Sequence, residues 1–193
     1  MDISLQAIKE YAYGAIQPSI LIKIQAADDV STHLVNSLKF FLNYLPTGDK
    51  TPTFEGSGLQ VDETTEASLF LRLLNGLNSY CGDQRFTPIK VFEEDDQLVY
   101  VLPTLSPMMA RHNIEAVSQF FQETQSGFSG TDVATFADKQ KTTCRGFLPS
   151  GTNAGNFIAA AAERRIPFKI FNQRYIIFGY GSGSTIFNSS LTN

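Results

Sequence analysis

The sequence predicts an α+β protein: a two-layer sandwich in the order β-α-α-β-β-α, followed by a short α-β-β-β segment. Apolar residues recur at helical spacing in three long stretches. Short β-branched runs lie between these stretches, and two of the runs flank an acidic turn, which is typical of a hairpin. Helices that each bury one apolar stripe against such a hairpin form a two-layer sandwich. With 193 residues, 42% of them hydrophobic, the chain can bury a core.

The first strand, helix and loop are expected within the first third of the chain. A β-branched run predicts a strand over residues 19–25. Asp28 or Asp29 can cap the helix that follows, expected over about 30–44, because a carboxylate accepts free N–H groups of a first turn. Residues 46–62 are rich in Pro, Gly, Thr and Ser and predict a loop.

A second helix is expected from Thr64 or Thr65 to Tyr80, where leucines recur at helical spacing. Gly82 is placed to end it as a C-terminal cap. The remaining elements of the sandwich are strands expected over 86–92 and 98–102 and a helix expected over about 107–122.

Three regions are expected along the chain. They are an N-terminal α+β domain over residues 1–125, a linker over 126–144, and an incomplete segment over 145–193 that begins a further module. Residues 123–142 are polar and contain glycines, which predicts a loop with one short helix. The final segment is expected to form a helix over 153–165 and strands over 167–171, 174–178 and 185–191. It is too small to hold a core by itself.

Composition excludes several classes of partner. A net charge of −4 and a pI near 5.1 give no field that would attract nucleic acid or an anionic membrane, so neither partner is expected. The N-terminus has no signal-peptide pattern, and no apolar stretch reaches about 18 residues. Two cysteines, Cys81 and Cys144, fit a reduced cytosolic protein, although the sequence leaves a disulfide between them open. A cytoplasmic location is therefore expected.

No catalytic residue and no metal site is predicted in this chain. His33 and His112 are the only histidines, and neither has Asp, Glu or Cys at metal-ligand spacing, so surface or helix-end positions are expected. Ser150 and Ser182 do not lie in the pattern of a nucleophile elbow.

A candidate anion-binding site is Gly151, Thr152 and Asn153, which directly precede a predicted helix. Free N–H groups at the start of a helix attract anions. The motif lacks the Gly-Lys-Ser/Thr ending of a P-loop, so no cation is supplied for the phosphates. Simple helix capping and anion binding are both compatible with these residues.

A candidate substrate-binding loop is Gly179, Tyr180, Gly181, Ser182 and Gly183. It is not the dinucleotide fingerprint, because its third glycine comes one residue early and a strand-like run follows. One interpretation is a turn or bulge between strands, where glycine permits a positive φ. The other is a backbone that closely approaches a substrate.

The segment from Phe147 to Ser190 resembles the junction in ATP-grasp ligases of the cyanophycin-synthetase type. The matching residues are Ala159-Ala-Ala-Ala-Glu-Arg-Arg165, Ile166-Pro167-Phe168, the turn at Asn172 and Phe178-Gly179-Tyr180-Gly181. In that family a small α+β domain is followed by a helix, an Ile-Pro strand, a turn and a strand whose Gly-Tyr-Gly opens the ATP-grasp module. Family members carry basic residues after the glycines, whereas residues 182–188 have none.

The resemblance implies the start of an enzyme that activates a carboxylate as an acyl phosphate with Mg-ATP and joins it to an amine. The ligands of ATP and Mg would lie beyond Asn193, so no cofactor is expected in this chain and both are expected for the full-length enzyme. The present residues would recruit or orient an amino-acid, peptide or polymer substrate, and a homo-oligomer could form through the full-length protein. By itself the chain would not be catalytic.

Two other functions are compatible with the sequence. The chain could be a stand-alone, non-enzymatic module that binds a peptide or an amino-acid polymer. It could also be a small enzyme that uses its glycine loops as an anion site.

Overall fold

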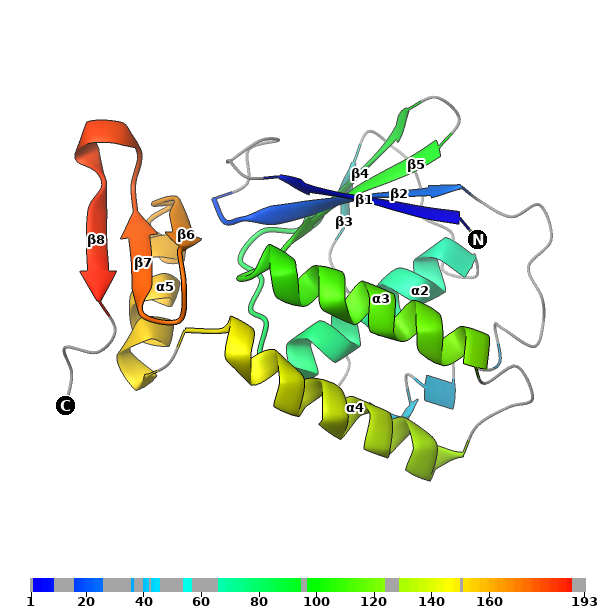
Figure 1. Cartoon of the computed structure of the whole chain (residues 1–193). Coiled ribbons are helices and arrows are strands. Elements are labelled where there is room, and N and C mark those ends of the chain that lie inside the picture. The colour runs from blue at the N-terminus through cyan, green and yellow to red at the C-terminus, as the bar shows by residue number, and fades with distance from the viewer. Residues whose placement is uncertain are drawn as a thin grey trace.

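A computed structural model of the chain describes residues 2–8, 16–25, 36, 40–41, 43–45, 54–56, 66–94, 97–123, 129–149 and 151–188. They form a five-stranded sheet covered by helices and a smaller three-stranded sheet with its own helix (Figure 1). The predicted α+β class is confirmed.

The larger sheet has the strand order β1-β2-β5-β4-β3. Its strands are β1 (Asp2–Ile8), β2 (Ser19–Gln25), β3 (Phe54–Gly56), β4 (Ile89–Glu94) and β5 (Gln97–Pro103). Neighbouring strands are antiparallel except β3 and β4, which are parallel. The strand predicted over 19–25 and the hairpin predicted from 86 to 102 are both confirmed.

Two strands of this sheet were not predicted. The β1 sequence alternates apolar Ile3, Leu5 and Ala7 with polar residues, which is the period of a half-buried strand. Strand β3 has only three residues, and it lies in the region predicted as a loop over 46–62. That prediction is wrong for residues 54–56, whose extended conformation comes from pairing with β4; the rest of the region lies outside the described residues.

Two long helices cross one face of the sheet, α2 (Glu66–Tyr80) and α3 (Pro107–Glu123) (Figure 1). Helix α2 ends where expected: Gly82 has a φ of 94°, and the N–H of Asp83 donates to the carbonyl of Asn78 at 2.9 Å. The N–H of Gly82 donates to Ser79 at 3.0 Å, which completes a Schellman motif. The expected starts at Thr64 or Thr65 lie outside the described residues.

The helix predicted over 30–44 is described only in part. Residues 36, 40, 41, 43 and 44 are helical, and the remainder, with the expected caps Asp28 and Asp29, lies outside the described residues. Phe41 is fully buried and meets Phe120 of α3 edge-on, with ring centroids 5.5 Å apart.

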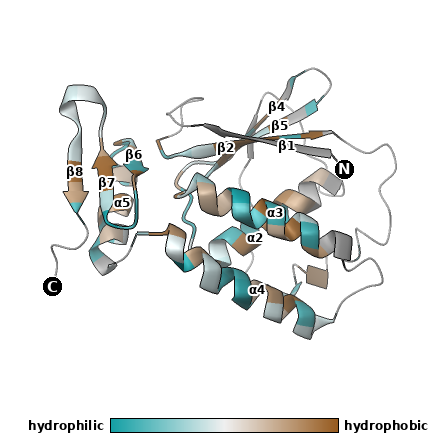
Figure 2. Cartoon of the chain, in the orientation of Figure 1, coloured by the Kyte–Doolittle hydropathy of each residue, from teal (hydrophilic) through white to brown (hydrophobic). Residues whose placement is uncertain are grey.

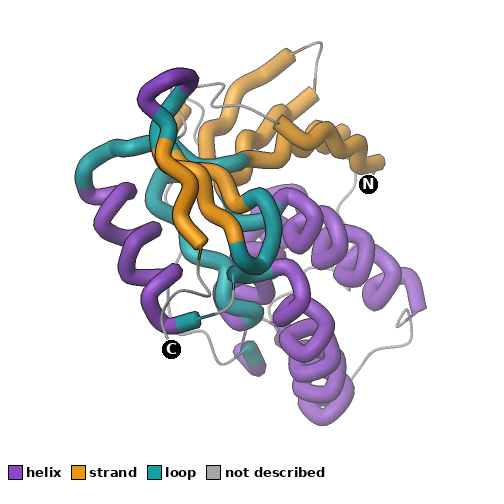
Figure 3. Tube along the Cα trace, turned by 60° about the vertical axis from the view of Figure 1, so that its left-hand side comes forward, coloured by secondary structure: helices purple, strands orange, loops and turns teal. Residues whose placement is uncertain are grey.

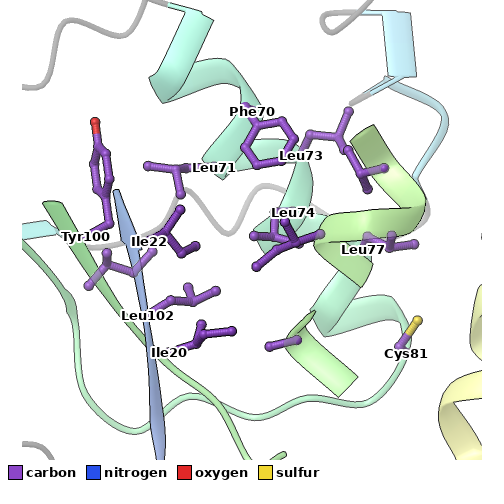
Figure 4. Close-up of a cluster of buried hydrophobic side chains, with 14 of the residues drawn as sticks. Ile20, Ile22, Phe70, Leu71, Leu73, Leu74, Leu77, Cys81, Tyr100 and Leu102 are labelled. Atoms are coloured by element: carbon purple, nitrogen blue, oxygen red, sulfur yellow. The ribbon is translucent and has the colours of Figure 1, made fainter. Parts of the chain in front are cut away.

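The first core fills the space between the sheet and these helices. Alternate residues of β2 face the helices, and the cross-strand pairs Ile20–Leu102 and Ile22–Tyr100 bring β5 residues to the same face. Figure 4 shows side chains of α2 opposite those of β2 and β5 across this core. Its largest fully buried members include Tyr100, Phe41, Phe70, Ile20, Ile22, Ile24, Leu71, Leu73 and Leu74. Burying one such side chain stabilises the fold by about 1.5–3 kcal/mol.

Helix α4 (Gly130–Cys144) is longer than the sequence predicts. A loop with one short helix was expected over 123–142, and this is wrong for the described residues from 130 onward. A capping box starts the helix: Ser129 accepts the N–H of Asp132, and the Asp132 carboxylate accepts the N–H of Ser129. Its buried residues are Val133, Ala137, Gln140 and Cys144, and the apolar ones belong to the first core. The region expected as a linker over 126–144 therefore packs, from residue 130 onward, as part of the first unit.

The second unit follows a short 3-10 turn, η2 (Arg145–Phe147). Its elements are α5 (Thr152–Glu163), β6 (Phe168–Ile170), β7 (Tyr175–Phe178), η3 (Gly181–Gly183) and β8 (Thr185–Asn188). The predicted α-β-β-β order is confirmed, and residues 189–191 of the last predicted strand lie outside the described residues. The strands form a sheet in the order β6-β7-β8, and α5 lies against it (Figures 1 and 3).

The second core is shared with the first unit. It contains Ala154, Ile158, Phe168 and Ile176 from the second unit, together with Leu105, which follows β5. Figure 2 shows apolar colour along β7, whereas α4 carries both polar and apolar positions. The small unit is thus stabilised by residues that the first unit supplies.

The first core predicts that shortening a buried apolar side chain lowers the free energy of unfolding far more than shortening an exposed one. Leu74, with 0% of its surface exposed, lies between α2 and the sheet, so Leu74→Ala should lower the free energy of unfolding by about 2–5 kcal/mol. Met108 is 70% exposed on α3, and Met108→Ala should change it by less than about 0.5 kcal/mol. Urea denaturation measures both, and equal losses would contradict this description of the core.

Candidate functional site

The predicted loop Gly179–Gly183 is the turn that joins β7 to β8. The N–H of Gly179 donates to the carbonyl of Pro167 at 2.7 Å, and that of Gly183 to the carbonyl of Tyr180 at 3.1 Å. The N–H of Ser184 donates to Gly181 at 3.1 Å. Several backbone groups are therefore used within the chain, as the interpretation as a turn requires. Substrate binding by this loop stays a prediction.

Glycine is required at the first position of this turn. Gly179 has a φ of 84°, a conformation that side chains disfavour, and an added Cβ would lie 3.0 Å from the carbonyl oxygen of Gly183. Tyr180 is 56% exposed, and Gly181, Ser182 and Gly183 are also exposed. The turn is thus open to solvent.

The candidate anion site at Gly151, Thr152 and Asn153 begins α5. Gly151 occupies the N-cap position with a φ of 104°, and it makes no side-chain cap hydrogen bond. The start of α5 and the glycine turn lie at opposite ends of the second unit (Figures 1 and 3). The structure therefore does not bring the two predicted sites together, and anion binding at Gly151 stays a prediction.

A polar cluster at the junction of the two units was not predicted from the sequence. We call Gln17, Asp83, Thr104 and Leu105 the junction cluster. The Asp83 carboxylate accepts the N–H of Leu105 at 2.6 Å, and Leu105 in turn contributes its side chain to the second core. The N–H of Thr104 donates to the carbonyl of Pro18 at 2.9 Å. One buried carboxylate thus fixes the backbone that links the two cores.

The segment around Gln17 holds several chain segments together. The Gln17 side chain donates to the carbonyl of Gln84 at 3.1 Å and accepts the N–H of Phe86 at 2.7 Å. One residue earlier, the carbonyl of Ile16 accepts the N–H of Phe168, at the start of β6, at 3.0 Å. Phe86 meets Phe168 edge-on, with centroids 6.0 Å apart. These contacts fasten the second unit to the first.

Asp83 has an unusual electrostatic environment. It is 5% exposed, and its second carboxylate oxygen has no hydrogen-bond partner. Burial raises the pKa of Asp83 to about 7, against the opposing effects of the Leu105 N–H, the Thr104 side chain and the nearby Arg85 charge. A carboxylic acid that titrates near neutral pH is a feature that functional sites often share.

A second unpredicted cluster joins the three helices of the first unit. We call Asn78, Cys81, Asn113 and Cys144 the thiol–amide cluster, because each member is buried and carries an amide or a thiol. The Asn113 amide donates to Asn78 at 2.7 Å, and the Cys144 thiol donates to the Asn113 carbonyl oxygen at 3.3 Å. Cys81 is a free, buried thiol of the same core. Figure 4 shows the Cys81 sulfur directed away from the strands.

The two thiols differ in acidity. Hydrogen bonding with the Cys144 side chain, together with burial, raises the pKa of Cys81, whereas hydrogen bonding with the Cys81 side chain lowers the pKa of Cys144. A sequence signal for this cluster existed: Leu74, Asn78 and Cys81 follow one helical stripe, so the amide falls on an otherwise apolar face.

His112 is placed close to this cluster but not in a metal site. Its Nε2 lies 2.8 Å from Oε1 of Gln140, and its ring is 5.9 Å from that of Phe147. It is half-buried inside α3, so the expected surface or helix-end position is wrong; His33 lies outside the described residues. Among the described residues, no three His, Cys, Asp or Glu side chains are grouped to hold a metal ion.

The chain matches no protein-family model and no curated protein sequence. Within the described part of the chain, none of the helices has both the length and the apolar character needed to cross a membrane.

The junction cluster predicts that the free energy of unfolding changes with pH because of Asp83. Because the pKa of Asp83 rises from 3.8 to about 7 on folding, the folded protein binds an extra proton between these pH values. The stability that this group contributes is complete below pH 3.8 and is lost as the pH rises through about 7. The difference in unfolding free energy between the wild type and Asp83→Asn should therefore fall by at most about 4 kcal/mol from pH 4 to pH 8.

The control for this prediction is Glu115→Gln, which removes an exposed carboxylate paired with Arg111 at 3.0 Å. A surface ion pair contributes less than about 1 kcal/mol, so this difference should stay nearly constant with pH. Urea denaturation across the pH range measures both variants. The same pH profile for both would contradict the assignment to Asp83.

The glycine turn predicts that alanine destabilises the protein at Gly179 but not at Gly183. Gly179→Ala should lower the free energy of unfolding by about 1–3 kcal/mol, because alanine is strained at this φ and crowds the carbonyl of Gly183. A Cβ added at Gly183 would have no atom within 4 Å, so Gly183→Ala should change the free energy of unfolding by less than about 0.5 kcal/mol. Thermal and urea denaturation provide the measurement, and equal effects would show that the turn does not constrain Gly179.

Proposed function

We propose that this chain is the substrate-recruiting or scaffolding part of an ATP-dependent carboxylate–amine ligase, whose catalytic module lies outside these 193 residues. The ligase would form amide bonds through an acyl phosphate. The observation that carries the proposal is the outer face of the β6-β7-β8 sheet, which exposes the apolar residues Tyr175 and Ile186 although the opposite face is well packed.

The strand register defines this outer face. Lys169, Ile177 and Ile186 lie side by side across β6, β7 and β8, on the face opposite to buried Phe168 and Ile176. Ile186 is 65% exposed. Tyr175 belongs to the same face, because it is two residues from Ile177 on β7, and it is 38% exposed. Exposed apolar residues side by side on a sheet face are suited to packing against further protein.

Local charge also supports the proposal. The chain has a net charge of −4, whereas residues 145–193 contain a single acidic residue, Glu163. Their basic residues are Arg145, Arg164, Arg165, Lys169 and Arg174. Carboxylates, acyl phosphates and ATP are all anionic, and cationic groups stabilise the charge of phosphoryl transfer. The second unit is thus suited to lie beside an anionic site.

In this proposal the described residues recruit and orient an amino-acid, peptide or polymer substrate, and the module outside this chain holds ATP and Mg. The glycine turn, which is open to solvent, would form part of the wall of that module. We propose a cytoplasmic location, where ATP and free thiols are both maintained.

The ligase proposal is tested by comparing this chain with the product of its complete open reading frame. We expect the complete product to release ADP only when both a carboxylate and an amine substrate are present, and the 193-residue chain to release none. An open reading frame that ends near Asn193, without a further domain of roughly 250 residues, would contradict the proposal.

The outer face is tested by substitution in the complete product. Ile186→Ser should reduce ADP release at least tenfold, because it places a hydroxyl in the packed contact, while the isolated chain keeps its melting temperature. Met108→Ser, at an apolar residue of α3 that is 70% exposed, is the matched control and should keep full activity. Equal activity of the two variants would show that the outer face has no such role.

A further inference from the structure

Strand β8 has one edge that no described strand covers. It is the last strand in the order β6-β7-β8, and among the described strands it pairs with β7 alone. An uncovered edge presents a row of backbone N–H and C=O groups to which another strand can bind. The outer edge of β8 is therefore able to accept one more strand.

The hydrogen bonds of the small sheet show which residue of β8 faces this edge. The N–H of Phe171 donates to the carbonyl of Tyr175 at 2.9 Å, so Tyr175 directs its backbone groups toward β6. These directions alternate along a strand, so Ile176 directs its groups toward β8. Ile176 pairs with Phe187, and the backbone groups of Phe187 therefore point to β7. Those of Ile186 point away from the sheet.

The strand lacks the features that prevent pairing at an edge. Natural edge strands are protected by lysine, by proline or by a bulge. The β8 sequence contains neither residue, its register with β7 is continuous, and no residue from 175 to 193 is charged. Ile186 is 65% exposed although it is apolar. An edge of this kind is suited to pairing with an uncharged strand.

We propose that two copies of this chain pair through β8 in antiparallel orientation, with Ile186 of one copy opposite Ile186 of the other. This interface goes beyond the ligase function and does not depend on it. Pairing uses the edge of the sheet and leaves its outer face uncovered.

An identical strand fits this edge because of its symmetry. Around a two-fold axis each Ile186 lies opposite its own copy, so the two residues exchange two N–H···O hydrogen bonds. Thr185 of one copy then lies opposite Phe187 of the other, and such pairs of aromatic and β-branched residues stabilise sheets.

Charge also favours a second copy as the partner. A charged residue at the centre of a two-fold pair would face the same charge, and β8 has none. The five basic residues of the second unit all precede β7, so none of them lies on the strand at the axis. A charged partner would find no opposite charge on this strand.

Pairing would join two three-stranded sheets into one sheet of six strands. Phe187 packs against Phe157 of α5, with ring centroids 4.5 Å apart, so β8 is held in place before it pairs. Two four-residue strands bury less surface than the roughly 1,200 Å² of a stable complex, so we expect a weak dimer whose population rises with concentration.

The test combines sedimentation velocity of the 193-residue protein, from low micromolar to millimolar concentration, with amide hydrogen exchange by NMR. We expect a monomer at the lowest concentrations and a dimer at the highest. The Ile186 amide should exchange several times more slowly in the dimer, because its N–H is bonded only there. The Phe187 amide faces β7 and should change little.

Charges placed at residue 186 test the two-fold register. Ile186→Lys and Ile186→Glu should each stay monomeric, because like charges would lie directly opposite each other. An equal mixture of the two variants should form a mixed dimer. The matched control is Phe171→Lys, at a residue that is 68% exposed beside β6, the strand farthest from this edge, and it should dimerise like the wild type.

The exchange rates of the wild type decide the proposal even if a variant fails to fold. A monomer at every concentration would overturn it, and any strand on this edge would then belong to a different protein. A dimer without protection of the Ile186 amide, or a mixture of the charged variants that stays monomeric, would also overturn it. Loss of the dimer in Phe171→Lys would place the contact on the outer face instead of the edge.

Discussion

The contact between the buried Asp83 carboxylate and the Leu105 N–H is the constraint on which the rest of the structure depends. Asp83 is positioned by the glycine cap of α2, which turns the chain sharply at Gly82. Leu105 inserts into the second core, so one hydrogen bond links the end of a helix in the first unit to the packing of the second. The position of the outer sheet face follows from this attachment.

Burying the Asp83 carboxylate at this junction is electrostatically unfavourable. A charged carboxylate with one oxygen unpaired is unfavourable when buried, and its raised pKa is the measure of that cost. The Schellman motif and the Gln17 contacts preserve the geometry despite it, because they bind backbone groups that are independent of the Asp83 charge. The junction is thus defined by backbone hydrogen bonds and tuned by one titratable side chain.

The thiol–amide cluster forms where three helices of the first unit meet. Asn78 and Cys81 extend the apolar stripe of α2, and Asn113 and Cys144 approach it from α3 and α4. Polar groups inside a core are tolerated only when they bind one another, and this pairing gives the helices a fixed mutual register. It also buries both thiols of the chain beside these amides.

Local patterns in the sequence determined α2, α3, the β4–β5 hairpin, the cap at Gly82 and the α-β-β-β order of the second unit, because periodicity, turn residues and capping act over a few positions. Local patterns also identified the glycine turn and the start of α5 as candidate sites, but they did not indicate that the two lie at opposite ends of the second unit. Tertiary structure alone decided that residues 54–56 form a strand, that the polar α4 packs on the core, and that Asp83 and the two cysteines are buried. These features depend on partners 20 to 60 or more residues away, and no local pattern records which distant groups will supply a strand edge, a hydrogen bond or an apolar contact.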